Sequence, residues 1–218
     1  MNKEQNEQIP SRVAMVLYYG MRVFAACSIV IFLSRAEWSS AFSAGAILVL
    51  MFLPAFLKEQ YRLYLPFGLE VAVTTFIFLT LFLGSLANFY EQIFWWDDML
   101  HVLSGFLFAL LGYIVVYVLN SEHVGKLDLS PIFIAVFSFC FSLALSVVWE
   151  IYEFAADQLL GFNMQRDGIM DTMTDLIGNA VAALLVSIFA YFWMRHQNKV
   201  PFTPKKLSKF QYTGRSKK

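Results

Sequence analysis

Residues 131–149 read PIFIAVFSFCFSLALSVVW, a stretch of 19 residues without a charge that ends directly before Glu150. At 1.5 Å per residue in an α-helix, this stretch is about 28 Å long, close to the hydrocarbon thickness of a bilayer. Its apolar residues are continuous rather than alternating, which argues against a strand of a membrane β-barrel. The stretch therefore predicts a membrane-spanning helix that ends near Glu150.

Five other segments also have the length and apolar composition of spanning helices. Hydrophobic residues make up 59% of the 218 residues and charged residues 15%, which is more apolar than a soluble domain of this size can bury. The predicted spans cover residues 13–34, 38–57, 63–88, 99–120, 131–155 and 172–194. We therefore predict an all-α, polytopic integral membrane bundle of about six transmembrane helices over residues 13–194.

The basic residues lie mostly on one side of these spans. Thirteen of the sixteen Lys and Arg residues fall in the N-terminal segment, in two loops of the same side and in the C-terminal tail. Loops rich in Lys and Arg stay in the cytoplasm. We therefore expect residues 1–12 and the basic tail 195–218 to be cytoplasmic, in the inner (cytoplasmic) membrane of a cell. The expected partner is the lipid bilayer, and no feature indicates nucleic acid.

The acidic residues are concentrated on the opposite side. Nine of the sixteen lie there, most of them close to the ends of the last three spans. Uncharged runs of 18 or 19 residues follow His101, precede Glu150 and follow Asp175. Because each run is about as long as the hydrocarbon is thick, these three side chains should lie at one level, the outer edge of the bilayer.

Helical spacing then gathers further acids beside these three. Residues three or four apart share a face of a helix, and charges inside a membrane protein turn away from lipid toward the bundle interior. We therefore expect a metal or cation site in an outward-facing pocket. Its predicted ligands are His101, Asp97, Glu150, Glu153, Asp171 and Asp175, with Asp98, Asp157 and Asp167 as weaker candidates.

Such a set of carboxylates repels itself unless something compensates for its charge. A divalent cation suits Asp, Glu and one His, and Mg²⁺, Mn²⁺, Ca²⁺ and Zn²⁺ all fit, so its identity stays open. The alternatives are shared protons with raised pKa values or an acidic rim in contact with water. Cys27 and Cys140 lie in apolar segments, which excludes a disulfide scaffold and a thiolate zinc site.

Other residues of the spans also have predicted structural roles. Arg22 and Glu70 would each be costly alone in a membrane, so we predict a structural pair between them. Trp95 and Trp96 are typical of the aromatic belt at a membrane surface. Gly105 should allow close approach of a neighbouring helix.

Three stretches of the last three spans resemble a known family. They are Asp97-x-x-x-His101-x-x-x-Gly105, Trp149-Glu150-x-x-Glu153, and Asp171-x-x-x-Asp175 followed by Gly178. Over residues 90–190 the chain resembles the YjdF-like bacterial inner-membrane proteins, which are similar to the VanZ-like membrane proteins. The resemblance implies a multi-pass inner-membrane protein. The YjdF-like family has no settled activity, and the VanZ-like proteins are associated with reduced susceptibility to certain glycopeptide antibiotics.

Three functions are compatible with these patterns. The first is a cation-binding protein, and specifically a metal-dependent enzyme that acts on a lipid-linked or envelope-linked substrate, with a remaining carboxylate as general base. The second is a proton- or ion-coupled transporter, although the spans carry few charged residues at mid-depth. The third is a non-catalytic envelope or antibiotic-resistance protein. The sequence shows no nucleophile, so it assigns no catalytic residue.

Overall fold

The computed structural model describes residues 11–60, 66–122, 129–166 and 168–197, and these residues contain helices and no strand. Six segments are long and apolar enough to cross a membrane. They are Arg12–Ser34, Trp38–Gln60, Phe67–Leu86, Trp96–Val116, Pro131–Leu160 and Ile169–His196. The six predicted spans and the all-α fold are confirmed, with bounds that differ by a few residues. The chain divides into two compact units, residues 1–96 and 97–218.

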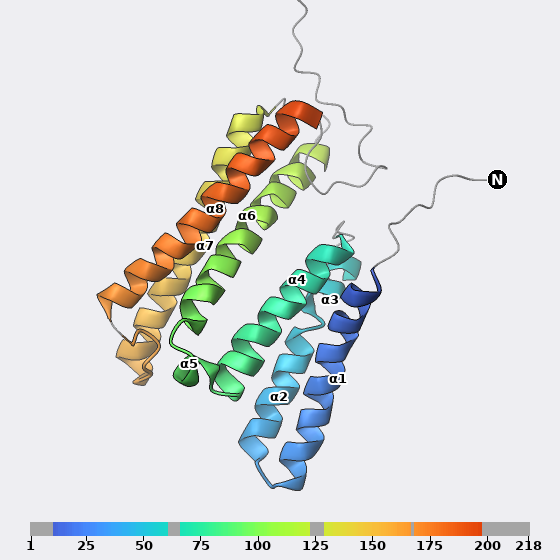
Figure 1. Ribbon diagram of the computed structural model, residues 1–218, viewed down its shortest axis with the longest axis vertical. Helices are drawn as coiled ribbons and strands as arrows, with labels where there is room; N and C mark the ends of the chain where they lie inside the picture. The colour runs from blue at the N-terminus through green and yellow to red at the C-terminus, as the bar shows by residue number, and fades with distance from the viewer. Residues whose placement is uncertain (1–10, 61–65, 123–128, 167, 198–218) are drawn as a thin grey trace, which may run out of the picture. The chain divides into compact units, whose positions relative to one another are not determined.

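The first unit is built from helices that pack along one another (Figure 1). Its core contains Ala25, Ala44, Ile47, Met51 and Phe82, contributed by the first three spans. Small alanines at these positions allow the helices to approach closely. The elements are α1 (Arg12–Ser34), α2 (Trp38–Leu50), α3 (Leu53–Gln60), α4 (Phe67–Ile77), the π-helix η1 (Phe78–Leu86) and the short α5 (Phe89–Gln92).

The second span is interrupted, although the sequence predicts one continuous helix over residues 38–57. The helix α2 ends at Leu50, and α3 begins at Leu53. Pro54 lies at the second position of α3 and has no N–H with which to bond the carbonyl of Leu50. The chain turns at Met51 and Phe52, where the amide of Phe52 donates to the carbonyl of Val49 at 3.0 Å. Pro54 thus accounts for the break.

The third span also differs from a simple α-helix. Pro66 precedes its first residue with a φ of −56°, which suits the start of a helix. The first eleven residues are α-helical, and the span then continues as the π-helix η1 to Leu86. It ends before Asn88, which adopts a left-handed φ of 60° that Asn tolerates better than most residues. The hydrophobic pattern predicted the span but not its change of helix type.

In place of the predicted Arg22–Glu70 pair, the two charged groups have different main partners within the first unit, and Tyr18 contacts both of them. Glu70 forms an ion pair with Lys58, and Tyr18 donates to its Oε2 at 3.4 Å. Arg22 donates from Nη2 to the carbonyl of Met51 at 2.5 Å, and its Cζ lies 3.7 Å from the centre of the Tyr18 ring. The break after α2 leaves that carbonyl available to Arg22, and Lys58 follows the break closely enough to reach Glu70.

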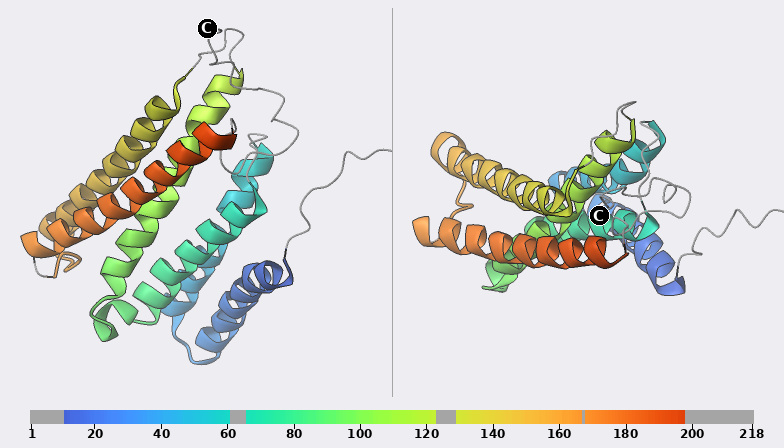
Figure 2. Two further views of the ribbon diagram at one scale, coloured as in Figure 1. Left: turned by 45° about the horizontal axis from the view of Figure 1, so that its top comes forward. Right: turned by 90° about the horizontal axis from the view of Figure 1, so that it is seen from above.

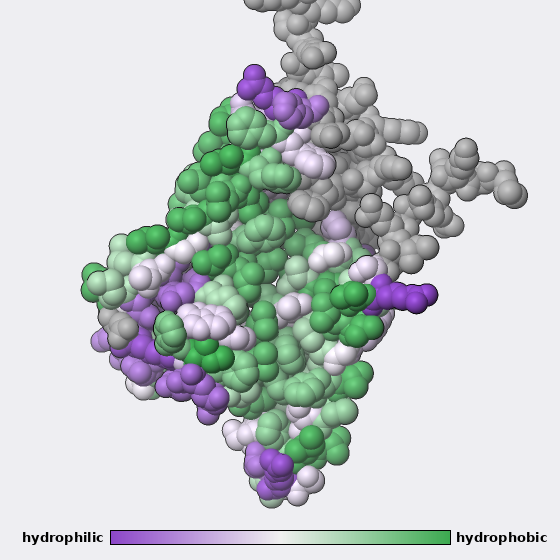
Figure 3. Space-filling model, viewed as in Figure 1, coloured by the Kyte–Doolittle hydropathy of each residue, from purple (hydrophilic) through white to green (hydrophobic). Residues whose placement is uncertain are grey.

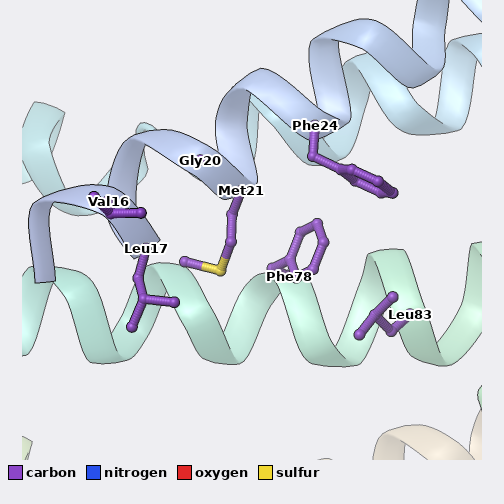
Figure 4. Close-up of a pocket in the computed structure, with 7 residues that line it drawn as sticks. All are labelled: Val16, Leu17, Gly20, Met21, Phe24, Phe78 and Leu83. Atoms are coloured by element: carbon purple, nitrogen blue, oxygen red, sulfur yellow. The ribbon is translucent and has the colours of Figure 1, made fainter. Parts of the chain in front are cut away.

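The first unit also carries an apolar cavity of about 460 Å³ between α1 and the third span. Figure 4 shows Met21 and Phe24 pointing from α1 toward Phe78 on the neighbouring helix. Gly20 adds no side chain, and a Cβ built there would have no neighbour within 4 Å. The lining residues are Val16, Leu17, Gly20, Met21, Phe24, Phe78 and Leu83.

The second unit consists of three long helices, α6 (Trp96–Glu122), α7 (Pro131–Leu160) and α8 (Ile169–Gln197). They lie side by side in both orientations of the molecule (Figures 1 and 2). Ser130 caps α7 by accepting the amide of Phe133 at 3.2 Å, and Gly161 ends the helix with a φ of 70°. An apolar core holds the half of this unit away from the acidic residues. It contains Ala109, Tyr113, Val116, Ile134, Ala183, Val186, Ala190 and Met194.

The outer surface of the helices is largely hydrophobic (Figure 3). Many large apolar side chains are exposed along the spans, among them Phe42, Val148 and Leu185. This exposure is expected where lipid rather than water surrounds the protein. Cys27 and Cys140 are free and exposed. Hydrophilic residues gather where α7 ends and α8 begins (Figure 3).

Candidate metal centre

The three residues that were predicted to lie at one level are close together in the second unit, one on each of its three helices. His101 on α6, Glu150 on α7 and Asp175 on α8 are all buried. The Nδ1 atom of His101 lies 3.6 Å from Oε1 of Glu150, and its Nε2 atom lies 3.8 Å from Oδ2 of Asp175. Asp97 lies one turn before His101 on α6, with its Oδ1 3.7 Å from the same Nε2. The imidazole is thus at the centre of the acidic residues.

These side chains form two groups of three that share His101. Asp97, His101 and Asp175 make one group, and His101, Glu150 and Glu153 make the other; in each, the ligand atoms lie within 4.8 Å of one another. Two ligand atoms that are each about 2.1 Å from one ion, at a tetrahedral angle, are about 3.4 Å apart. The observed 3.6–3.8 Å separations exceed ordinary hydrogen bonds and are close to that spacing.

The carboxylates of this centre have little compensation from the protein. Both oxygens of Asp175 are buried and have no hydrogen-bond partner among the described residues. The buried oxygens of Glu150 make no hydrogen bond of ordinary geometry there, and only the side chains of Thr172 and Gln165 lie close enough to interact with them. Exposure is 5% for Glu150 and 1% for Asp175. Leaving a buried acceptor unsatisfied is costly, and leaving a buried charge unpaired costs more. A cation, protons or water would each satisfy these oxygens.

Glu153 differs from its neighbours because one of its oxygens already has a partner. The indole Nε1 of Trp149 donates to Oε1 of Glu153 at 2.9 Å, while Oε2 is buried without a partner among the described residues. Trp149 lies four residues before Glu153 on α7, so the two share a face. The spacing of four residues between Trp149 and Glu153 is the signal in the sequence that could have indicated this contact.

A layer of small polar side chains closes the bundle below the acidic residues. Asn179, one turn after Asp175, donates from Nδ2 to the hydroxyl of Ser104 at 3.2 Å, and Ser104 donates to the carbonyl of His101 at 2.8 Å. Ser142 on α7 lies 3.1 Å from the carbonyl of Gly105 and 3.3 Å from Oδ1 of Asn179, both within donating distance. This layer ties all three helices together and fixes the positions of His101 and Asp175.

Close approach of α6 and α8 holds this layer in place. A Cβ added to Gly105 would lie 2.4 Å from the carbonyl oxygen of Asn179. No side chain larger than hydrogen fits there without separating the helices. The prediction that Gly105 allows close helix approach is confirmed.

The remaining candidate ligands have other positions. Both oxygens of Asp157 accept backbone amides of the loop after α7, from Met164 at 2.7 Å and from Gln165 at 2.9 Å, so this carboxylate orders the loop. Asp98 is exposed, and Asp171 is half-buried one turn before Asp175. Neither belongs to the two groups around His101. Asp167 lies outside the described residues.

The fold and the surface identify the chain as a multi-pass membrane protein. It belongs to the family described as "Predicted membrane protein (DUF2238)", whose model matches residues 15–196. An uncharacterized protein of Thermotoga maritima is 30% identical over 130 residues, which cover 58% of this chain and 64% of that protein. The chain therefore spans less than two thirds of the length of this relative. No solved structure matches the chain.

Proposed function

We propose that this protein binds a divalent cation at the acidic centre of its last three helices. The support is the set of buried oxygens on Glu150 and Asp175 next to the imidazole of His101; those of Asp175 have no hydrogen-bond partner in the part of the chain that the structure describes. Carboxylates and one imidazole are suitable ligands for Mg²⁺, Mn²⁺, Ca²⁺ or Zn²⁺.

Purified protein in detergent tests this proposal directly. After treatment with chelator, Mn²⁺ should bind in about equimolar amount, and its spectrum should broaden when measured by electron paramagnetic resonance. His101→Ala and Asp175→Asn should abolish the bound signal. Asp98→Asn is a matched control, because Asp98 is on the same helix end but exposed. Absence of bound Mn²⁺, Mg²⁺, Ca²⁺ and Zn²⁺ in the unaltered protein would contradict the proposal and favour the proton network.

The orientation in the membrane is part of the proposal. Cytoplasmic termini follow from the distribution of Lys and Arg, and the resemblance to YjdF-like and VanZ-like proteins favours the bacterial inner membrane. The acidic centre then faces the outer side. With Cys27 and Cys140 replaced by Ala, single cysteines at Phe94 and Asn163, both exposed, should react in whole cells with an impermeant thiol reagent. Reaction only after permeabilisation would reverse the orientation.

The surface beside the centre favours a membrane-bound substrate for a metal-dependent reaction. Large apolar side chains remain exposed at the ends of α7 and α8 that carry the acids, and we call them the outer apolar patch. It contains Phe154, Leu159, Leu160, Phe162, Ile169 and Met170. An amphiphile could lie against this patch with its polar group at the cation, where a bound metal would polarise it.

A pair of photocrosslinking positions separates this idea from ordinary contact with lipid. A crosslinker at Leu159 should capture a lipid with a phosphate headgroup more strongly with Mn²⁺ than with chelator. Ile132, exposed at the opposite end of the same helix, is the matched position and should show no dependence on metal. Equal capture at Leu159 with and without Mn²⁺ would show that the outer apolar patch only contacts the lipid bilayer and does not bind a substrate.

A further inference from the structure

The centre has two sides, because His101 has acidic groups at both of its ring nitrogens. Asp97 and Asp175 lie at Nε2, whereas Glu150 lies at Nδ1. A neutral imidazole has one nitrogen that accepts or ligates and one that carries a proton. It can therefore bind an ion on one side only, and its other nitrogen donates. The question is which group is ligand and which is hydrogen-bond acceptor.

We infer that the cation binds at Nε2 of His101 together with Asp97 and Asp175, and that Glu150 is a positioning residue. Its Oε1 lies 3.6 Å from Nδ1 here and moves closer to accept the Nδ1 proton when the ion is bound. This inference rests on the proposed cation binding and assigns separate roles within it. Histidines that bind metals usually donate their second ring N–H to a carboxylate or carbonyl, which fixes the tautomer and the orientation of the ring. Glu150 is the carboxylate in that position.

Three observations favour the Nε2 side. Asp175 is 1% exposed and neither of its oxygens has a partner among the described residues, so it has the greatest need of a cation. Asp97 is 20% exposed at its side chain, which leaves a route for the ion from outside. Asp97 and His101 stand four residues apart on one helix, a spacing that places two ligands on the same face.

The Nδ1 side is less suited to an ion. One oxygen of Glu153 is occupied by the indole of Trp149, which leaves its other oxygen as the remaining ligand atom. Glu150 and Glu153 are both at least 95% buried, so an ion at Nδ1 would have no ligand in contact with the outer surface. The layer formed by Ser104, Ser142 and Asn179 closes the bundle from below.

Nuclear magnetic resonance can identify the nitrogen that binds. The chain has three histidines, and replacement of His123 and His196 by Gln leaves His101 as the only labelled imidazole. With ¹⁵N-histidine and ¹¹³Cd²⁺, scalar coupling should appear at Nε2, and Nδ1 should remain protonated. Coupling at Nδ1 would overturn the inference while leaving cation binding intact. Absence of any bound Cd²⁺ and Mn²⁺ would remove both proposals.

Affinities of matched variants provide an independent measurement. Asp97→Asn and Asp175→Asn should each weaken Mn²⁺ binding on the order of 100-fold, because an anionic ligand is lost. Glu150→Leu should weaken it about 10–100-fold, the usual effect of losing such an outer partner. Glu150→Gln should restore most of that loss, since an amide oxygen still accepts the Nδ1 proton. If Gln is as poor as Leu at position 150, or if Asp97→Asn binds normally, Glu150 is a ligand and the inference is wrong.

Discussion

The two units of this protein differ in the partners that they provide for buried carboxylates. In the first unit, each oxygen of Glu70 has a partner, Lys58 for one and Tyr18 for the other. In the second unit, the oxygens of Asp175 have none among the described residues, and those of Glu150 have only the nearby side chains of Thr172 and Gln165. Buried charges are tolerated when they are paired and hydrogen-bonded. The first set therefore compensates itself, whereas the second has the unpaired oxygens on which the proposed cation site rests.

The largest effect that separates the two units should be stabilisation by metal. An ion that binds only the folded form stabilises it by about 2.7 kcal/mol at a hundredfold excess over Kd. We expect Mn²⁺ to raise the unfolding temperature of the unaltered protein in detergent and to have no effect on Asp175→Asn. Glu70→Gln should keep the full response to Mn²⁺. Loss of the response in Glu70→Gln would show that the two sets of charges are not independent.

Loss of the Lys58–Glu70 ion pair in Glu70→Gln should lower the free energy of unfolding by somewhat less than bound metal raises it. Truncating one member of a buried pair costs about 3–5 kcal/mol, and the exposure of Lys58 reduces this to about 2 kcal/mol for Glu70→Gln. The double variant Lys58→Met with Glu70→Leu should recover much of the loss, measured by unfolding in denaturant. The combination of Arg22→Met with Glu70→Leu should show no such recovery. If stability recovered in the Arg22→Met, Glu70→Leu variant and not in the Lys58→Met, Glu70→Leu variant, Glu70 would pair with Arg22, as the sequence predicts.

Glycines in the two units should respond differently to an added methyl group. Gly105→Ala should destabilise by about 1.5 kcal/mol, because its Cβ meets the backbone of Asn179 and the helices must separate. The same change should weaken Mn²⁺ binding, since Asn179 and Ser104 position the ligands. Gly20→Ala in the first unit meets nothing within 4 Å and should leave both properties unchanged. Equal effects of the two substitutions would argue against a tightly held centre.

Much of the fold could be predicted because the membrane imposes a simple length requirement. Uncharged runs after His101, before Glu150 and after Asp175 gave the last three spans and the common level of these residues. Helical spacing added Asp97 and Glu153. The sequence could not show which of several acids on a stripe points at the imidazole, because small differences in helix rotation decide it. Asp157 shares the stripe of Glu150 but bonds the backbone of a loop.

Other features depended on contacts between distant segments. Pro54 in the sequence could have indicated the break after α2. The hydrogen bond from Arg22 to the carbonyl of Met51 could not be predicted, because it requires α1 to lie beside this break. Lys58 and Glu70 are twelve residues apart across a loop, so their pairing follows from the packing and not from one helix face. The polar layer below the centre had a partial signal, since Asn179 continues the spacing of Asp171 and Asp175.

The smallest expected effect is the change in stability when a buried Glu is replaced by Gln, and its sign should differ between the two units. In the presence of chelator, Glu150→Gln replaces a buried carboxylate by a neutral amide and removes its repulsion from Asp175 and Glu153. We expect this variant to be more stable than the unaltered protein by about 1 kcal/mol. Glu70→Gln should be less stable under the same conditions, since it removes a partner from Lys58. Parallel denaturant unfolding of both variants gives the comparison. If both changes destabilise the protein by similar amounts, the carboxylate of Glu150 is already compensated within the chain, and the need for an external cation disappears.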